Sequence, residues 1–567
     1  MSGAEDYYRL LAEALDSAAQ ERGKLAKIER LAGALRGLSG ARLAIAARLL
    51  SGSPFAEWEQ QVTSAGWATL ARAASAVTGW DLETIGSCAG AIGDLGEAVS
   101  LLIEPGGAEQ SPSPPPSPAG RRSELTILEI DQTLRALASQ RRAAQKQQAI
   151  EELLRRSSPV EAKYLVKTLS GGLRTGADIL TVEEAIARAF ERDREAVARA
   201  RRDCGDIGET AVAARDGRLE EITFRLFHPI GFMLASPIED PEEVVPDLSS
   251  LAIEEKFDGI RAHAHKSGSR VALFSRTLDD VTLQFPEIAM ALALAPGEFL
   301  LDGEIVAWKD SRPDSFFRLQ RRLGRKAPPN ELLAEIPVAF IAYDCLARSG
   351  DPLFEVPWQE RRRHLEEIAA ASAHFHLSEV FRATDIEELE RLFAQARARG
   401  NEGLMFKRLD STYQAGKRGK SWRKWKKALA TLDVVVTAVE QGHGKRAGML
   451  SDYTFAVKDG DRFVNIGKAY SGLTDEEIRR MGTHFRSITT GRYGPVRAVR
   501  PEVVIEVAFD TIQKSNRHKS GFALRFPRIV RLRPDKTPAD ATTLSEVRQL
   551  HDTLAGAQST GATVTPK

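Results

Sequence analysis

Lys256 lies in the segment EEKFDGIRA, where its side chain could act as a nucleophile. A lysine amine attacks only after it has lost a proton, and its free pKa is about 10.4. Partial burial and nearby cations lower that pKa. Attack on the α-phosphate of a nucleotide would form a phosphoramidate, and Gly259 would let the backbone approach the phosphates or the sugar closely. Because K-x-D-G also arises by chance in surface turns, the motif needs support from elsewhere in the chain.

Two acidic motifs follow the lysine at the ends of strand-like runs. The motif LDGE contains Glu304, and the motif NEGLMFKR contains Glu402. Carboxylate oxygens at two strand ends could hold Mg²⁺ beside a triphosphate, although a single acid in such a turn is more often structural. Tyr343, in the run PVAFIAYD, could offer its aromatic face to a base. Alternatively, Tyr343 is a buried residue of the hydrophobic core.

Three basic clusters are hidden by a net charge of only +1. The first is KRGKSWRKWKK, residues 417–427, whose two tryptophans among the cations suit phosphate contact. The second is RFPRIVRLRPDK, residues 525–536, which would place Arg525, Arg531 and Arg533 on one face of a strand. The third contains Arg321, Arg322, Arg325 and Lys326. Each cluster could instead be a solvated face or a set of surface ion pairs.

The secondary structure that is predicted to position these residues differs between segments of the chain. Apolar residues recur three and four positions apart in residues 1–104, and a second helical block occupies residues 123–225. Residues 105–122, rich in proline and serine, are predicted to be an extended linker. Residues 226–430 contain short strand-like runs separated by helices, which predicts an α+β region.

Residues 431–540 contain about five strand-like runs and one helix, which is compatible with a small OB-type barrel. Asp459-Gly460 is predicted to turn a hairpin, and Thr474 with Glu477 is predicted to form a capping box. The tail at 541–567, rich in Ala, Thr and Ser, is expected to be loose at its end.

The composition argues against several classes of protein. Cys88, Cys204 and Cys345 lie far apart and have no CxxC spacing, which argues against a disulfide framework and a structural zinc site. The first residues do not read as a signal peptide, and no run of about 18 apolar residues predicts a membrane span. A cytoplasmic protein is therefore expected.

Taken in order, these segments resemble the covalent nucleotidyltransferase superfamily and, within it, the ATP-dependent DNA ligases, in particular the larger bacterial type. EKFDGIRA resembles motif I, FSR motif Ia, LDGEIV motif III, FIAYDCL motif IIIa, EGLMFKR motif IV, SWRKWKK motif V and RFPRIVRLRPDK motif VI. FFRLQRRLGRK is similar to the basic segment after motif III, and EAKYLVKTLSGGLRTG to a segment of the N-terminal DNA-binding domain. The match covers roughly residues 150–540, and the order of the motifs is more specific than any one of them.

The resemblance implies a multidomain protein with an all-α N-terminal DNA-binding domain, an α+β adenylation (nucleotidyltransferase) domain and a C-terminal β-barrel OB-fold domain. It implies that Lys256 takes AMP from ATP, that AMP passes to the 5′-phosphate at a nick, and that the 3′-hydroxyl then displaces AMP. It also implies Mg²⁺ or Mn²⁺ as cofactor, nicked duplex DNA as partner, and a role in DNA repair, replication or recombination. A monomer is expected.

The resemblance also implies roles for single residues. Glu254 would recognise adenine, and Arg261 would contact the ribose or a phosphate. Arg276 would also bind the nucleotide. Glu304 would contact the ribose and the metal, and Glu402 the metal. Tyr343 would stack on the base, with Phe340 as its rival. Lys424 and Lys426 would hold the α-phosphate, and Arg531 and Lys536 the pyrophosphate. DNA contacts are expected from Arg321, Arg322, Arg325, Lys326 and Arg418.

Three other functions stay open on the sequence. An RNA ligase and a GTP-using capping guanylyltransferase share the lysine chemistry, but the helical N-terminal block argues against both. A non-catalytic DNA-binding scaffold is a different class, and the intact set of Lys256, Glu304, Glu402 and Lys426 argues against it. NAD-dependent ligases are disfavoured because their four-cysteine zinc module has no counterpart here.

Overall fold

The computed structural model describes residues 7–103 and 125–560, except residues 311, 315, 326, 369–371, 427–429, 443–445, 447, 495 and 510. The chain divides into two compact units. The first contains Met1–Ser64, Ser123–Arg141 and Gly171–Lys427, and the second contains Ala65–Arg122, Arg142–Ser170 and Ala428–Lys567. The predicted linker at 105–122 lies outside the described residues.

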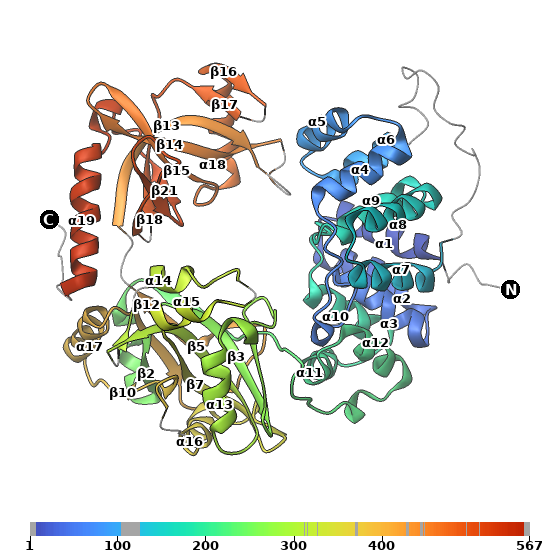
Figure 1. Cartoon of the computed structure of the whole chain (residues 1–567), viewed down its shortest axis with the longest axis horizontal. Helices are drawn as coiled ribbons and strands as arrows, with labels where there is room; N and C mark the ends of the chain where they lie inside the picture. The colour runs from blue at the N-terminus through green and yellow to red at the C-terminus, as the bar shows by residue number, and fades with distance from the viewer. Residues whose placement is uncertain are drawn as a thin grey trace. The chain divides into compact units, whose positions relative to one another are not determined.

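Helices dominate the described chain before residue 234, as Figure 1 shows. In the first unit they are α1 (Tyr8–Gln20), α2 (Lys24–Arg36), α3 (Gly40–Ser51), η2 (Glu57–Glu59), α7 (Ile127–Ser139), α10 (Ile179–Ala189), α11 (Arg194–Cys204), α12 (Ile207–Asp216) and η4 (Leu219–Glu221). In the second unit they are α4 (Trp67–Thr78), α5 (Leu82–Ile92), α6 (Leu95–Ile103), α8 (Ala143–Arg156) and α9 (Pro159–Leu169). Buried residues recur at helical spacing, for example Leu11, Leu15 and Ala18 in α1, so each helix turns one apolar face to the core.

Two sheets form the central region of the first unit. The five-stranded sheet has the order β1-β12-β11-β2-β10. Its strands are β1 (Leu234–Ile238), β2 (Leu251–Lys256), β10 (Val380–Phe381), β11 (Gly403–Arg408) and β12 (Arg418–Lys426). Its buried apolar side chains pack on η5 (Pro241–Ser250) and α17 (Ile386–Ala398).

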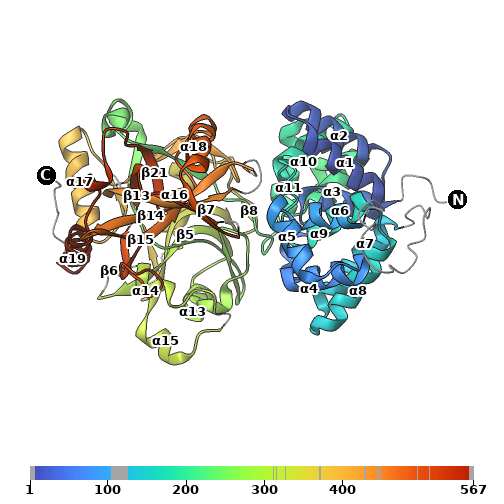
Figure 2. The same ribbon diagram turned by 90° about the horizontal axis from the view of Figure 1, so that it is seen from above.

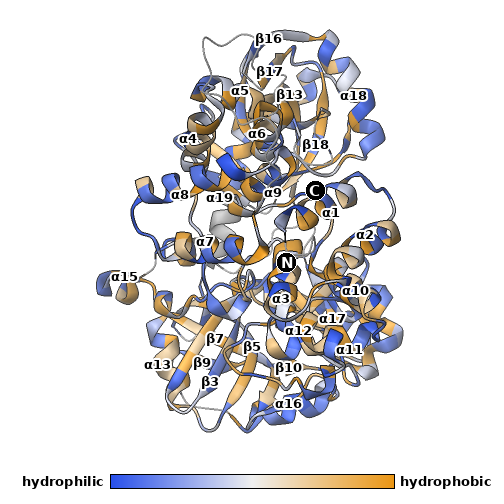
Figure 3. Ribbon diagram, turned by 90° about the vertical axis from the view of Figure 1, so that its right-hand side faces the viewer, coloured by the Kyte–Doolittle hydropathy of each residue, from blue (hydrophilic) through white to orange (hydrophobic). Residues whose placement is uncertain are grey.

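The seven-stranded central sheet has the order β4-β3-β5-β7-β8, with β6 added on β5 and β9 on β7. Its strands are β3 (Ile260–Ser267), β4 (Arg270–Ser275), β5 (Phe299–Lys309), β6 (Arg312–Pro313), β7 (Val338–Arg348), β8 (Asp351–Pro352) and β9 (Phe375–Leu377). Hydrophobic residues are frequent in β5 and β7 (Figure 3).

Helices cover one face of this sheet and close its core (Figure 2). They are α13 (Pro286–Leu294), α14 (Phe316–Gln320) and α15 (Asn330–Glu335), with η6 (Thr282–Gln284) before them, and α16 (Trp358–Glu366) contacts β7. Phe299, Leu301 and Phe340 of the strands are buried against Ile288 and Leu292 of α13 in one cluster. Other buried apolar residues of β5 and β7 form separate clusters, with Leu300 and Leu346 in one and Val306 and Ile341 in another.

The C-terminal part of the second unit is rich in strands. A seven-stranded sheet runs β15-β14-β13-β17-β16, with β18 paired to β13 and β21 to β18, while β19 and β20 pair with each other. The elements are β13 (Ala430–Gln441), β14 (Leu450–Asp459), β15 (Arg462–Ala469), α18 (Asp475–Ser487), β16 (Thr489–Tyr493), β17 (Val496–Val499), β18 (Val504–Phe509), β19 (Thr511–Lys514), β20 (Phe522–Arg525) and β21 (Arg528–Leu532).

Two local predictions for this region can be compared with the structure. The capping box of Thr474 and Glu477 at the start of α18 is confirmed. The predicted hairpin is β14–β15, but it turns through Gly460 and Asp461, one residue later than Asp459-Gly460, because Asp459 pairs with Arg462. Gly460 has a φ of 61°, and a positive φ at the first position of a two-residue turn favours glycine.

The tail at 541–567, which was expected to be loose at its end, begins with a packed helix. After η8 (Pro538–Asp540), the helix α19 extends over Leu544–Thr560. Leu544 and Val547 are buried with the core of the strand-rich region. Thr543 and Glu546 cap the helix by reciprocal hydrogen bonds of 2.6 and 3.2 Å, which is a signal that the sequence offered. Residues 561–567 lie outside the described residues.

The predicted fold class is confirmed: a helical N-terminal region, a central region with sheets and a strand-rich C-terminal region. All three cysteines are free, as expected. Among the residues that the structure describes, no helix has both the length and the apolar character needed to cross a membrane.

Candidate active site

Three neighbouring strands bring the predicted lysines together. Lys256 ends β2 opposite Gly403 of β11, and Gly403 is in turn opposite Lys426 of β12. Two residues earlier in β2 and β12, Glu254 and Lys424 are both in register with Met405. Because side chains alternate along a strand, Glu254, Lys256, Lys424 and Lys426 share one face of the sheet.

Gly403 makes this alignment possible. Its φ is 151°, and an added Cβ atom would lie 2.2 Å from the carbonyl oxygen of Trp425. The close approach places Glu402 directly beside the end of β2, where its amide donates to the carbonyl oxygen of Lys256 at 2.7 Å. Asn401, just before it, donates to Glu255 at 2.6 Å, although the two residues are 146 positions apart in the chain.

Glu402 is the carboxylate partner of the lysines. The Nζ atom of Lys256 lies 3.0 Å from Oε2 of Glu402, and that of Lys426 lies 3.7 Å away. Burial raises the pKa of Glu402, but the charge and hydrogen bond of Lys256, with Lys426 and Lys424, outweigh it and lower that pKa overall. Burial, followed by the charges of Lys256 and Lys426, lowers the pKa of Lys424. The site is thus a cluster of three cations around one charged acid.

Glu304 approaches from the other central sheet. Gly259 allows this, because a Cβ atom there would lie 2.3 Å from the carbonyl oxygen of Ile305 and 2.9 Å from Cγ of Glu304. Burial is the main cause that raises the pKa of Glu304 to about 8; Lys256 and Arg261 oppose it, and Glu402 and Asp302 add to it. At neutral pH the carboxyl is therefore mostly protonated and can donate a hydrogen bond.

The donor set fits a hard divalent cation that is shared with a substrate. Among the described residues, no group of three or more His, Cys, Asp or Glu side chains could hold a metal ion alone. Mg²⁺ commonly takes one or two carboxylates and completes its shell with phosphate oxygens and water. Glu402, which stays charged, and Glu304, which a nearby cation would return to its charged form, supply two carboxylates of that kind.

Tyr343 and Phe340, the two candidates for stacking on a base, lie in different surroundings. Phe340 is 0% exposed, and an added Cβ atom on Gly303 would lie 2.4 Å from its Cζ atom. Its ring also stacks on Phe375, with centroids 6.3 Å apart. Tyr343 is half-buried and lies under the Nζ atom of Lys407, 4.4 Å from its ring centroid. The surroundings favour Tyr343 as the ring that can meet a base.

Glu254 lies at the same end of the site and is 2% exposed. It forms an ion pair with Lys407 and accepts a hydrogen bond from Ser378 at 2.8 Å. Arg362 lies 3.7 Å from its carboxylate. Lys407 was not singled out from the sequence, although the run EGLMFKR placed a cation two residues beyond Met405, on the same face of the strand.

Arg261 is held by the protein itself. It binds both oxygens of Asp302, at 3.0 and 2.6 Å, and donates to the carbonyl oxygen of Met233 at 2.6 Å. Burial raises the pKa of Asp302, but the charge and hydrogen bond of Arg261 outweigh it and lower that pKa well below its ordinary value. Tyr413 also donates to Asp302 at 2.9 Å. The sequence showed Asp302 as one of the two acids of LDGE, but its pairing with Arg261 was not predicted, although an acid inside an apolar run signals a buried pair.

The basic residues predicted to contact DNA divide into several groups. The prediction that Arg322 lies on a basic surface is wrong: its side chain is 0% exposed and binds Glu287 at 2.5 Å and two backbone carbonyls. Arg321 is exposed but forms an ion pair with Glu335 at 2.5 Å. Arg325 and Arg418 are exposed, and Lys326 lies outside the described residues. Arg276, which was predicted to bind the nucleotide, is also exposed.

The predicted pyrophosphate ligands belong to the second unit and are paired there. Arg531 lies 2.7 Å from Glu506, and Lys536 lies 2.6 Å from Asp433. Arg533 binds Asp433 at 3.0 Å and Asp535 at 2.7 Å. The expectation that Arg525 shares a strand face with Arg531 is wrong, because Arg525 ends β20 and the chain turns at Phe526, whose φ is 47°, before β21.

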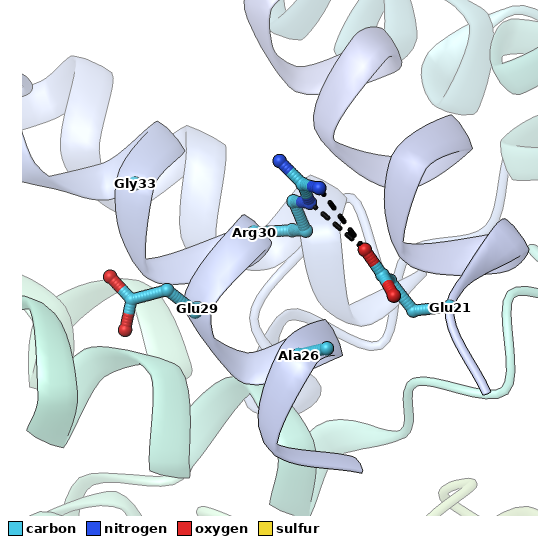
Figure 4. Close-up of a pocket in the computed structure, with 5 residues that line it drawn as sticks. All are labelled: Glu21, Ala26, Glu29, Arg30 and Gly33. Atoms are coloured by element: carbon cyan, nitrogen blue, oxygen red, sulfur yellow. Dashed lines mark hydrogen bonds and ion pairs between the residues drawn. The ribbon is translucent and has the colours of Figure 1, made fainter. Parts of the chain in front are cut away.

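A hollow between α1 and α2 contains none of the predicted site residues. It is lined by Glu21, Ala26, Glu29, Arg30 and Gly33 (Figure 4). Arg30 donates to Glu21 across it at 3.1 and 3.2 Å. With its only arginine engaged in this way, the hollow offers none of the chemistry described around Lys256.

Known families match three successive parts of the chain. The model of the DNA ligase N terminus matches residues 7–187, that of the ATP dependent DNA ligase domain residues 232–426, and that of the ATP dependent DNA ligase C terminal region residues 446–536. A probable DNA ligase of Koribacter versatilis is 43% identical over 96% of both chains. A DNA ligase of Methanoculleus marisnigri is 34% identical over 93% of this chain and 95% of its own. The solved structure Pmar-Lig_PreS3, at 16% identity, shares the fold with a TM-score of 0.55 over 92% of this chain and 99% of its own.

Proposed function

Since this chain belongs to the ATP-dependent DNA ligase family, whose members seal nicks through adenylate intermediates, we propose that Lys256 is the residue that carries AMP. The observation that carries the proposal is the contact of 3.0 Å between Lys256 and Glu402, with Lys424 and Lys426 on the same face of the sheet. A phosphate bound beside Lys256 would be surrounded by cations, and phosphoryl transfer requires positive charge around the reacting phosphate.

In the first step the deprotonated amine of Lys256 forms a bond to the α-phosphorus of ATP, and the bond to pyrophosphate breaks. Lys424 and Lys426 stabilise the charge that develops on the α-phosphate. Glu402 accepts a hydrogen bond from Lys256 and so fixes the position of the amine before attack. Arg531 and Lys536 are proposed to orient the departing pyrophosphate.

In the second step an oxygen of the 5′-phosphate at the nick attacks the phosphorus of AMP, and the bond to Lys256 breaks. In the third step the 3′-hydroxyl attacks the 5′-phosphorus, a phosphodiester bond forms and AMP departs. The reacting phosphorus is that of AMP in the first two steps and that of the 5′-phosphate in the third, and the same cations are proposed to stabilise both.

The remaining residues hold the nucleotide and the metal. Tyr343 is proposed to stack on adenine, Glu254 to read its edge, and Glu304 to contact the ribose. Glu402, with Glu304, would hold Mg²⁺ or Mn²⁺, which neutralises phosphate charge when bound. Arg261 is proposed to act at the ribose or a phosphate while it is anchored by Asp302, and Arg276 at the nucleotide.

Nicked duplex DNA is proposed to contact the helical region, assigned to residues 1–104 and 123–225, together with Arg321, Arg325 and Arg418. Adenylation is assigned to residues 226–430 and the OB-fold domain to residues 431–540. A monomer acting in the cytoplasm, in repair, replication or recombination, fits this activity.

The proposal is tested by incubation of the full chain with α-labelled ATP and by intact-mass measurement. Lys256→Ala should lose both the covalent label and the sealing of a nick, because it removes the amine that lies 3.0 Å from Glu402, while Lys424 and Lys426 are proposed only to stabilise the α-phosphate. Lys309→Ala, at an exposed lysine that ends β5, is the matched control and should keep both. AMP found on the Lys256→Ala protein would show that another residue is the nucleophile.

A further inference from the structure

Three arginines gather where α18 ends and the hairpin β16–β17 begins. Arg486 lies in the last turn of α18, Arg492 lies in β16, and Arg497 lies in β17. Arg492 and Arg497 face each other directly across the two strands. Among the residues that the structure describes, none of these three, which we call the hairpin arginines, forms an ion pair or a side-chain hydrogen bond.

This arrangement costs stability. Like charges placed directly opposite each other on neighbouring strands repel. Burial, followed by the charges of Arg492 and Arg486, lowers the pKa of Arg497, so both of the other side chains are close enough to act on Arg497. Arg486 and Arg492 are exposed and Arg497 is half-buried.

Nearby acids do not relieve the repulsion, because each already has a cation. Glu502 binds Arg500 at 3.1 Å and lies 3.3 Å from His484. Glu440, which pairs with Val496 of β17, lies 2.9 Å from Lys468. Three cations of the RFPRIVRLRPDK segment differ from the hairpin arginines in this respect, since Arg531, Arg533 and Lys536 all have carboxylate partners.

A structural role explains only part of the cluster. Cations near the C-terminus of a helix interact favourably with its dipole, and Arg486 in the last turn of α18 has that position. Arg492 and Arg497 belong to strands and face each other, so the same explanation does not account for them. Three unpaired arginines instead match a ligand that carries several regularly spaced anions, because a guanidinium binds phosphate with two parallel hydrogen bonds.

We propose that the hairpin arginines bind the phosphate backbone of duplex DNA beside the nick, as a contact of the strand-rich region separate from the cations of residues 525–536. The inference rests on the proposed ligase function, which supplies the DNA. Contacts to phosphate carry no sequence information, so this surface should act on any duplex sequence.

The test uses the full-length chain in which Arg486, Arg492 and Arg497 are all replaced by Ala. Affinity for a nicked duplex is measured by fluorescence anisotropy across a range of salt concentrations. Each arginine that neutralises a phosphate adds about 0.9 to the slope of log affinity against log salt, so the triple variant should lose about 2 to 3 from that slope. Its Tm should stay the same or rise, because a repulsive cluster has been removed. Its rate of lysyl-AMP formation with ATP alone should be unchanged.

Two control variants sharpen the result. Arg500→Ala removes the same charge from a neighbouring arginine that already has a partner, and it should change the slope by less than the loss of one hairpin arginine. The variant with Lys at all three positions keeps the charge and should restore most of the slope.

The inference is overturned if the triple variant keeps the wild-type slope, or if it loses Tm and adenylation together with DNA affinity, which is the pattern of a structural role. Binding of an acidic protein with no change in DNA affinity would likewise overturn it. Failure of the proposed ligase function would give a different result. The wild-type chain would then form no lysyl-AMP and seal no nick, whatever its affinity for DNA.

Discussion

Glu304→Gln should change how the stability of the protein depends on pH. Burial, opposed by Lys256 and Arg261 and aided by Glu402 and Asp302, raises the pKa of Glu304 to about 8, against an ordinary value of 4.5. Between these two values the folded chain keeps the proton while the unfolded chain releases it. The folded state therefore binds more protons over that range, and the free energy of unfolding of the wild type falls as pH rises from 4.5 to about 8.

The size of the effect follows from the same two values. At about 1.36 kcal/mol per pKa unit, the gap bounds the loss of stability at about 5 kcal/mol. Glutamine does not titrate, so the Glu304→Gln protein should gain on the wild type as pH rises. One kcal/mol corresponds to about 2–4 °C in Tm for a region of roughly 200 residues, so the difference in Tm between the two proteins should move by several degrees.

Thermal unfolding of the full chain, followed by circular dichroism from about pH 5 to about pH 9, measures that difference. Glu331→Gln, at an exposed glutamate in α15, is the control and should give a difference in Tm that stays flat with pH. A flat difference for Glu304→Gln as well would refute the reasoning, because it would show that the folded protein does not hold this carboxyl in its neutral form.

Two further predictions concern the nucleotide. Tyr343→Ala should raise the KM for ATP in adenylation by roughly three- to tenfold, because stacking on the base is lost. Phe340→Ala, at a fully buried ring, should instead lower the free energy of unfolding by about 3–5 kcal/mol. Equal KM changes in the two variants would contradict the choice of Tyr343. Arg531→Ala or Lys536→Ala should slow adenylation from ATP much more than sealing of a pre-adenylated nick, because pyrophosphate leaves only in the first step. Single-turnover rates on both substrates measure this, and a larger defect on the pre-adenylated nick would indicate that these cations grip DNA.

The resemblance to the ligase motifs predicted that Glu402, Lys424 and Lys426 lie around Lys256, and the strand register explains why they meet. Glu402 precedes β11, which neighbours β2, and Lys426 ends β12, which neighbours β11. Motifs at strand ends are readable from hydrophobic runs and the residues that follow them. The fold class followed from the same runs and from the helical spacing of the first 218 residues.

The acidic partners of several buried cations could not be predicted from the sequence. Arg322 looked like a surface cation in a basic run, but it is buried because Glu287, 35 positions away, supplies its counter-charge. The pairs of Arg261 with Asp302 and of Lys407 with Glu254 depend likewise on how the strands pack, which no local pattern encodes. The helix α19 is different, since its capping residues Thr543 and Glu546 are three positions apart and form a local pattern.

The position of β2 between β10 and β11 has a consequence for synthesis of the protein on the ribosome. Both neighbours of the strand that carries Lys256 are made later than it is, and the bond between Glu255 and Asn401 joins residues 146 positions apart. At about 5–20 residues per second, the strand waits on the order of ten seconds with neither edge paired. Such long-range pairing is slow to form and leaves an open strand edge in the meantime. A chain released before Glu402 is made would carry the nucleophile without the site that activates it.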